Sequence, residues 1–201
     1  MKREIKQLMS AVLLVVFSSL ATIAVANADG VMTLQPASPQ PDKAKLKPGL
    51  AVAYVYREVR WLDDAEGFRS YINPKNRKTL AGFVYGDTEL GQKILTADSD
   101  EYVIAFIDGY MHLNAGVQEL EFQSNDGVRI HLGGVEVYEH DGRHVCSTQG
   151  AVKVKAPVTG WYPVKTLFFQ RYNTACLDLS MRPEGGDWSF TSEDIYAHIP
   201  K

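Results

Sequence analysis

Residues 119–138 read ELEFQSNDGVRIHLGGVEVY, and this stretch decides the fold. Apolar and polar residues alternate on both sides of its two turns, which is typical of β-strands with one buried and one solvated face. The glycine pair at 133–134 predicts a two-residue hairpin turn. The SNDG sequence at 124–127 predicts the turn before it. We expect that turn to close a hairpin of fixed register, with Gly127 supplying a positive φ.

The same period of two continues through most of the C-terminal half, and apolar β-rich runs precede it. One short helix is expected over 63–71, and no alternation of strands and helices suggests a parallel sheet. We therefore predict an all-β fold, a single antiparallel β-sandwich. The further strands are expected at 50–56, 102–113, 152–155, 160–170 and 175–181.

The first 28 residues have the three parts of a secretory signal peptide. Residues 1–6 are basic, residues 8–26 are apolar or small, and small residues suit cleavage after Ala26 or Ala28. An uncleaved membrane anchor is the competing interpretation, because the apolar stretch approaches the roughly 20 residues that span a bilayer. We predict cleavage, export to the periplasm or the extracellular space, and no membrane span in the mature chain.

Residues 29–48 contain four prolines, little apolar content and no period. This composition predicts an extended tether outside the core. The domain would then span 49–201, which is long enough for one sizeable core and too short for two.

Charge and cysteine content narrow the class of protein. The chain has 21 Lys+Arg and 24 Asp+Glu, and the signal segment removes mainly basic residues. The mildly acidic remainder argues against nucleic acid as a partner. Cys146 and Cys176 are compatible with one disulfide in an oxidising compartment, or with two buried free thiols.

Several motifs, in order, resemble the PA14 family over Gly49 to Pro200. The SNDG turn at 124–127, with Gly109-Tyr110 ahead of it, is similar to the family's Ser-Asp-Asp-Gly turn and the glycine-tyrosine pair before it. Three positions depart from the family pattern: Gln118 replaces an aromatic residue, and Asn125 and Gly133 each replace an Asp. The later segments that resemble the family are 160–170 (GWYPVKTLFFQ), 177–181 and 192–196.

PA14 domains occur in bacterial toxins, glycosidases and yeast adhesins, and the resemblance implies a β-sandwich that often binds carbohydrate. In the sugar-binding adhesins, the paired acids of the turn hold Ca²⁺. The matching positions here are Asn125 and Asp126. An Asn side-chain carbonyl can ligate Ca²⁺, but the loss of one charge weakens such a site. A purely structural turn would use the same residues, because Asn and Asp side chains bond their own backbone.

The sequence lacks the motifs of a nucleophilic elbow, a zinc protease or a phosphate-binding loop. We therefore predict no catalytic residues. His140, Asp141 and His144 form a second candidate metal set, but no fourth zinc ligand accompanies them, and a solvated loop explains them equally.

The predicted function is that of a non-catalytic binding module. It would hold a carbohydrate or another envelope polymer through loops at one end of the sandwich, where binding residues usually lie. A structural or protein-interaction module of the cell envelope, without a sugar or metal ligand, is the alternative. The predicted contacts are Asn125, Asp126 and Gly127, with Tyr138 and Trp188 as stacking groups.

Overall fold

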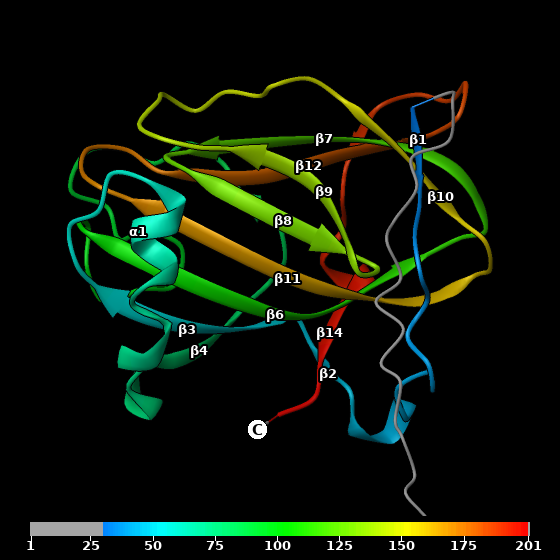
Figure 1. The fold of residues 1–201 in the computed structure, drawn as a ribbon, viewed down its shortest axis with the longest axis horizontal. Helices are drawn as coiled ribbons and strands as arrows, with labels where there is room; N and C mark the ends of the chain where they lie inside the picture. Colours follow the sequence, from blue (N-terminus) through cyan, green and yellow to red (C-terminus); the bar gives the residue numbers. More distant parts are fainter. Residues whose placement is uncertain (1–29, 201) are drawn as a thin grey trace, which may run out of the picture.

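The computed structural model describes residues 30–200, so the predicted signal peptide at 1–28 lies outside the described residues. Two β-sheets pack face to face (Figure 1). The first sheet has the order β1 (Val31–Thr33), β10 (Val152–Ala156), β7 (Gly116–Asn125), β12 (Cys176–Pro183) and β13 (Ser189–Phe190), with β5 (Val84–Tyr85) also paired to β12. The second has the order β2 (Lys47–Pro48), β14 (Tyr196–His198), β6 (Val103–Leu113), β11 (Gly160–Gln170), β8 (Val128–Leu132) and β9 (Val135–His140), with β3 (Leu50–Tyr56) paired to β6 and β4 (Arg77–Leu80) paired to β3.

Helical structure is confined to short segments within the described part of the chain. The helix predicted over 63–71 is present as two pieces, α1 and η2, because the chain bends at Gly67 and Phe68 between them. The prediction of an all-β sandwich is confirmed. The helical segments are α1 (Leu62–Glu66), η1 (Lys43–Lys45), η2 (Arg69–Tyr71), η3 (Pro74–Asn76) and η4 (Glu193–Ile195).

The core lies between the two sheets and is built from the apolar positions of the alternating strands. Leu120 and Phe122 on β7 face it from the first sheet, and Ile130 on β8 faces it from the second. The ring of Phe83 packs edge-on against Phe122 and Tyr196, with centroids 6.0 and 5.6 Å apart. Burial of each such side chain contributes about 1.5–3 kcal/mol, so the alternation in the sequence determines which face of each strand points inward.

The turn at 124–127 does not close a hairpin, and this prediction was wrong. β7 pairs with β10 and β12 in the first sheet, whereas β8 pairs with β11 and β9 in the second, so the turn carries the chain from one sheet to the other. Gly127 also lacks a positive φ. A Cβ on Gly127 would lie 2.3 Å from Cε1 of Phe169, so the glycine is needed for close packing rather than for backbone freedom.

The hairpin predicted at 133–134 is confirmed. Gly133 and Gly134 have φ values of 56° and 77°, and they join β8 to β9 within the second sheet. These angles are strained for residues with a Cβ, which explains a glycine pair at this turn.

The described part of the segment at 29–48, which was expected to be a tether outside the core, lies against the sandwich. β1 pairs in parallel with β10, and β2 pairs with β14. Leu34 is only 1% exposed and belongs to the core. The prolines had suggested a free segment, but this stretch needs few backbone donors because it lies along the edges of the two sheets.

One region of the second sheet's outer face is covered by α1 and the residues around it (Figure 1). Leu62 and Ala65 of α1 pack there with Phe106 and Leu167 in a second, smaller apolar cluster. No helix in residues 30–200 is both long and apolar enough to span a membrane.

Candidate functional site

A pocket of about 310 Å³ opens at one end of the sandwich, where β7 ends and β12 begins. Two loops form its walls: residues 141–151 lead from β9 towards β10, and residues 171–175 connect β11 to β12. The turn at 124–127 supplies its most deeply buried residues. The lining residues are Asn125, Asp126, Arg143, His144, Val145, Tyr172, Asn173 and Thr174, and we call this site the loop-end pocket.

The Asp126 carboxylate holds both loops to the turn. Oδ1 accepts a hydrogen bond from the backbone N–H of His144 at 3.1 Å, and Oδ2 accepts one from the backbone N–H of Arg171 at 2.9 Å. Asp126 is 2% exposed. Burial raises the pKa of its carboxyl above the usual range, against the opposing effect of the two N–H groups and of the nearby His144 and Arg143. The side chain therefore fixes the relative position of the two walls.

Two buried amides shape the second loop. Asn125 Nδ2 donates to Oγ1 of Thr174 at 3.0 Å, and the peptide bond between Asn125 and Asp126 is cis. Gln170, which is 1% exposed, donates from Nε2 to the carbonyl oxygens of Tyr172 and Thr174 at 2.7 and 2.8 Å. Because buried polar groups must find partners, these bonds leave the loop at 171–175 little freedom.

The first loop is fastened at three places. Cys146 and Cys176 form a disulfide, which joins the loop to the first residue of β12. Ser147 and Ser124 exchange two backbone hydrogen bonds of 3.1 Å each. The side chain of Asp141 accepts from the backbone N–H of Leu62 at 2.8 Å, which ties the loop to α1. The disulfide that the sequence allowed is thus present, and it lies beside the pocket.

The rim of the pocket combines cationic, aromatic and aliphatic groups. Cζ of Arg143 lies 4.6 Å from the ring centroid of Tyr172, and Cζ of Arg171 lies 5.1 Å from the same centroid. Such cation–π contacts contribute about 0.5–1 kcal/mol each at exposed sites. Val145 is 76% exposed beside them. The rim therefore presents apolar surface next to hydrogen-bond donors, as small-molecule sites generally do.

Comparisons with known proteins place this geometry in a fold family. The sequence matches no protein-family model and no curated protein. In structure, the chain is similar to the PA14 sugar-binding domain from an RTX adhesin, with a TM-score of 0.62 and 17% identity, over 75% of this chain and 98% of that one. It is also similar to the PA14 domain of MpAFP antifreeze protein, with a TM-score of 0.64 and 16% identity, over 79% and 93% of the two chains.

A third similar structure is the A domain of Epithelial Adhesin 9 from Candida glabrata, solved in complex with Galb1-3GlcNAc. Its TM-score is 0.62 at 11% identity, over 83% of this chain and 95% of that one. The chain has the fold of a PA14 domain. At these identities the likeness establishes the fold and not the ligand.

Calcium, which the PA14 resemblance implies at Asn125 and Asp126, does not fit the residues present. Ca²⁺ takes six to eight oxygen ligands and favours carboxylates. The turn offers one carboxylate, and cationic Arg143 lies close to it. Nor do residues 30–200 contain any group of three or more His, Cys, Asp or Glu side chains placed to hold a metal ion.

The second candidate metal set in this PA14-like chain forms a stacked pair instead. The rings of His140 and His144 lie face to face, with centroids 3.4 Å apart and planes within 2°. Parallel rings do not direct their nitrogens to one point, so a shared metal is disfavoured. Burial, with the neighbouring His144, lowers the pKa of His140. Asp141 is occupied by its bond to Leu62.

Tyr138 and Trp188 do not share a surface with the predicted turn. Tyr138 is 5% exposed, packs on Phe122 and accepts a hydrogen bond from the N–H of Gln149 at 2.9 Å. Trp188 lies beside Arg182, whose Cζ is 4.6 Å from its ring. Arg182 pairs with Glu119, six residues along β7 from the turn, which corresponds to about 20 Å.

The pocket contains residues that the sequence did not single out, above all Arg143 and Tyr172. Tyr172 lies in the connection between the strands expected at 160–170 and 175–181. A tyrosine among polar residues in a short connection is a weak signal, and no local pattern indicates that this loop faces residues 141–151.

Proposed function

We propose that this PA14-like chain is an exported, non-catalytic module that binds a carbohydrate in the loop-end pocket. The observation that carries the proposal is the fixed, mixed lining of that pocket: Asp126, the disulfide and Gln170 hold two loops in place around it. A site whose walls are held before binding avoids much of the ordering cost of association.

The lining suits a hydroxyl-rich ligand. Arg143 supplies donors, Asn125 and Thr174 supply amide and hydroxyl groups, and Tyr172 and Val145 supply apolar surface. Sugars present both hydroxyl edges and apolar ring faces, so both kinds of group find partners. The adhesin domains with the same fold support this assignment, since one is described as sugar-binding and another was solved with Galb1-3GlcNAc.

Export is the second part of the proposal. Residues 1–28 have the pattern of a cleaved signal peptide. The disulfide between Cys146 and Cys176 supports it, because disulfides persist mainly in oxidising compartments.

A glycan array, run once with calcium chloride and once with a chelator, tests the binding. We expect retention of one class of glycan under both conditions, because the turn does not fit Ca²⁺. Tyr172→Ala and Arg143→Ala should each weaken it about tenfold, the loss of roughly 1.4 kcal/mol typical of a central contact. Trp188→Ala, in the connection between β12 and β13, is the matched control.

Two outcomes would contradict this assignment. If the chelator abolishes retention, calcium takes part in binding at this site. An array without any bound glycan, together with a protein partner recovered by cross-linking from the native envelope, would support the protein-interaction module instead.

A further inference from the structure

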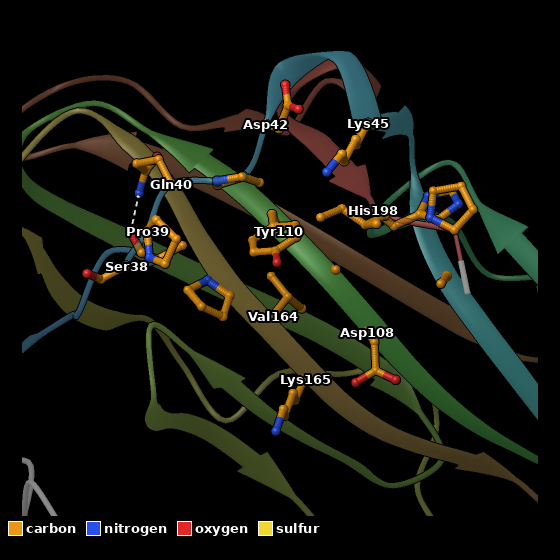
Figure 2. Close-up of a pocket in the computed structure, with 17 residues that line it drawn as sticks. Ser38, Pro39, Gln40, Asp42, Lys45, Asp108, Tyr110, Val164, Lys165 and His198 are labelled. Carbon is orange, nitrogen blue, oxygen red and sulfur yellow. Dashed lines mark hydrogen bonds between the residues drawn. The ribbon is translucent and has the colours of Figure 1, made fainter.

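A second, larger pocket lies on the outer face of the second sheet, and the loop-end pocket does not include it. Its volume is about 730 Å³, within the range of about 300–1,000 Å³ typical of ligand sites. The cluster under α1 covers the outer face at Phe106 and Leu167, and residues 37–42 cover it further along β11. Strands β6 and β11 form the uncovered floor between these two covers (Figure 2).

The wall at 37–42 is held in place by the Gln40 side chain and by a backbone hydrogen bond of 2.9 Å from the N–H of Ala37 to the carbonyl oxygen of Trp161. Gln40 donates from Nε2 to the carbonyl oxygens of Ala37 and Trp161 at 2.8 and 3.0 Å, and its Oε1 accepts from the N–H of Trp161 at 2.8 Å. A Cβ on Gly160 would lie 2.8 Å from that oxygen, so the glycine allows this docking. The segment once expected to be a tether is thus a built part of the pocket.

The floor carries one aromatic side chain beside an acid and a base. Asp108 and Lys165 are register partners on β6 and β11, and Tyr110 follows two residues later on the same face. Figure 2 shows Asp108 and Lys165 together at one end of the pocket, with Tyr110 between them and the wall at Asp42 and Lys45. Tyr110 is partly exposed and Lys165 is exposed.

The pocket continues into two neighbouring hollows of about 200 and 370 Å³. Asp108 lines all three, and Lys165 lines the largest and the third. The smaller of these hollows lies over β3 and β4, and the larger lies over β6, β8 and β11. The three hollows meet at Asp108, and we call them together the outer trough. An open trough suits a polymer that enters and leaves at its ends.

The chemistry of the outer trough restricts the class of ligand that it can bind. Both β6 and β11 are paired along both sides, so an added peptide strand has no free backbone edge to join. Acids and bases balance around the large pocket, where Asp42 and Asp108 accompany Lys45 and Lys165. The smaller hollows add more cations than acids, but most of these cations form ion pairs: Arg69 with Glu66, Lys78 with Asp98 and Arg129 with Glu139. This balance favours a ligand without net charge, and a tyrosine ring flanked by polar groups favours one with apolar faces and hydroxyl edges.

We propose that the outer trough is a second binding site, for an uncharged oligosaccharide chain. Tyr110 packs against a sugar ring, while Asp108 and Lys165 hydrogen-bond its hydroxyls. Gln40 is a positioning residue that holds the wall. The site stands apart from the loop-end pocket, and each proposal can fail without the other.

The test uses cellohexaose, chitohexaose and maltohexaose, with glucose and hexagalacturonic acid as contrasts, added to the ¹⁵N-labelled mature protein. We expect one uncharged hexasaccharide to shift the amide resonances of β6 and β11 around Tyr110 and Lys165, and to bind more tightly than glucose. Tyr110→Ala should weaken binding about tenfold. Gln40→Ala should weaken it less, and Lys155→Ala, an exposed lysine of the other sheet, should leave it unchanged.

Lys165→Gln guards against a Tyr110 variant that fails to fold, because this exposed side chain can change without disturbing the core. If neither folded variant weakens binding, the proposal is wrong. It is also wrong if none of the uncharged hexasaccharides shifts the trough resonances, or if hexagalacturonic acid binds in preference. Shifts confined to residues 125–126 and 172–174 would overturn the outer trough while supporting the loop-end pocket.

Discussion

Two turns lie within ten residues of each other along the chain, and the sequence predicts each to join alternating strands in a hairpin. In the structure they connect different elements. The turn at 133–134 joins neighbouring strands of one sheet through two positive φ angles, and Gly133 also lies close to Leu34 and Gln35. The turn at 124–127 crosses between sheets, and its Asn125 and Asp126 are buried. Where a turn crosses between sheets, the backbone N–H groups of the loops around it have no strand partner. The side chains of the turn must therefore accept these hydrogen bonds, as Asp126 does.

Removing the disulfide beside the crossing turn should lower the free energy of unfolding more than any other change. It closes a separation of 30 residues and fastens the loop at 141–151 beside the crossing turn. Cys146→Ala with Cys176→Ala should cost about 3–4 kcal/mol, and lower the Tm by about 10 °C. Thermal melts of the double variant and the oxidised protein measure it. An unchanged Tm would show that Asp126 and Asp141 hold the loop alone.

Asp126→Ala should come next in size. It removes the acceptor of two backbone N–H groups, those of His144 and Arg171, in a buried place. Each buried donor left without a partner costs about 1–3 kcal/mol. Because His144 and Arg171 are only partly buried, we expect the lower part of the range for the two donors, a loss of about 2–3 kcal/mol in urea unfolding. Glu136→Ala, beside the hairpin turn, is the control and should stay within about 0.5 kcal/mol. Equal losses at both sites would remove the distinction between the turns.

The two glycines give the third contrast. Gly127→Ala should cost about 2 kcal/mol, because its Cβ would lie 2.3 Å from the Phe169 ring. Gly134→Ala should cost about 1 kcal/mol, since its Cβ meets nothing within 4 Å and the cost comes only from its φ of 77°.

A double-mutant cycle identifies the cause of the Gly127 effect. If the ring is responsible, Phe169→Leu should reduce the cost of Gly127→Ala, and the two changes should be coupled. A larger loss at Gly134 than at Gly127 would mean that backbone angle, rather than packing, governs both turns.

The sequence predicted the sandwich well because alternation is a local signal. Leu120 and Phe122 lie inward whichever strands flank β7, so the strands and the core could be found without knowing the pairing. Pairing itself depends on long-range contacts. The SNDG turn was therefore located correctly but assigned to a hairpin, and β1 was missed because its pairing with β10 spans most of the chain.

The candidate site was predictable only in part, for the same reason. Asn125 and Asp126 are at the pocket, as their turn chemistry and the PA14 resemblance suggested. Arg143 and Tyr172 reach it from loops whose meeting is set by Asp126 and the disulfide. Tyr138 was misleading, because an aromatic residue in an alternating strand has the same pattern whether it stacks on a ligand or fills the core.

Asp126 has a useful counterpart in Asp178 of β12, which is 8% exposed. Two backbone N–H groups oppose the effect of burial on Asp126. For Asp178, burial alone raises the pKa to about 6. Backbone donors stabilise the charged form of Asp126, whereas burial without such donors destabilises the charged form of Asp178. The two should therefore respond to pH and to amide substitution differently.

Asp178→Asn should change the free energy of unfolding least, and the pKa of Asp178 determines the direction of that change. Since the folded pKa of about 6 exceeds the ordinary value of about 3.9, the folded state binds the proton more tightly. The stability that Asp178 confers is present below about pH 4 and is lost as pH rises through 6. Relative to the native protein, Asp178→Asn should thus gain about 1 kcal/mol between pH 4 and pH 8, a value reduced for partial solvent screening. Urea unfolding at both pH values measures it. Asp126→Asn should gain less over the same interval, because the two backbone N–H groups oppose the rise in the Asp126 pKa. It should also be less stable than the native protein at both pH values, because its amide cannot accept both N–H groups. A gain at Asp126 equal to that at Asp178 would mean that the two backbone donors do not stabilise the charged turn.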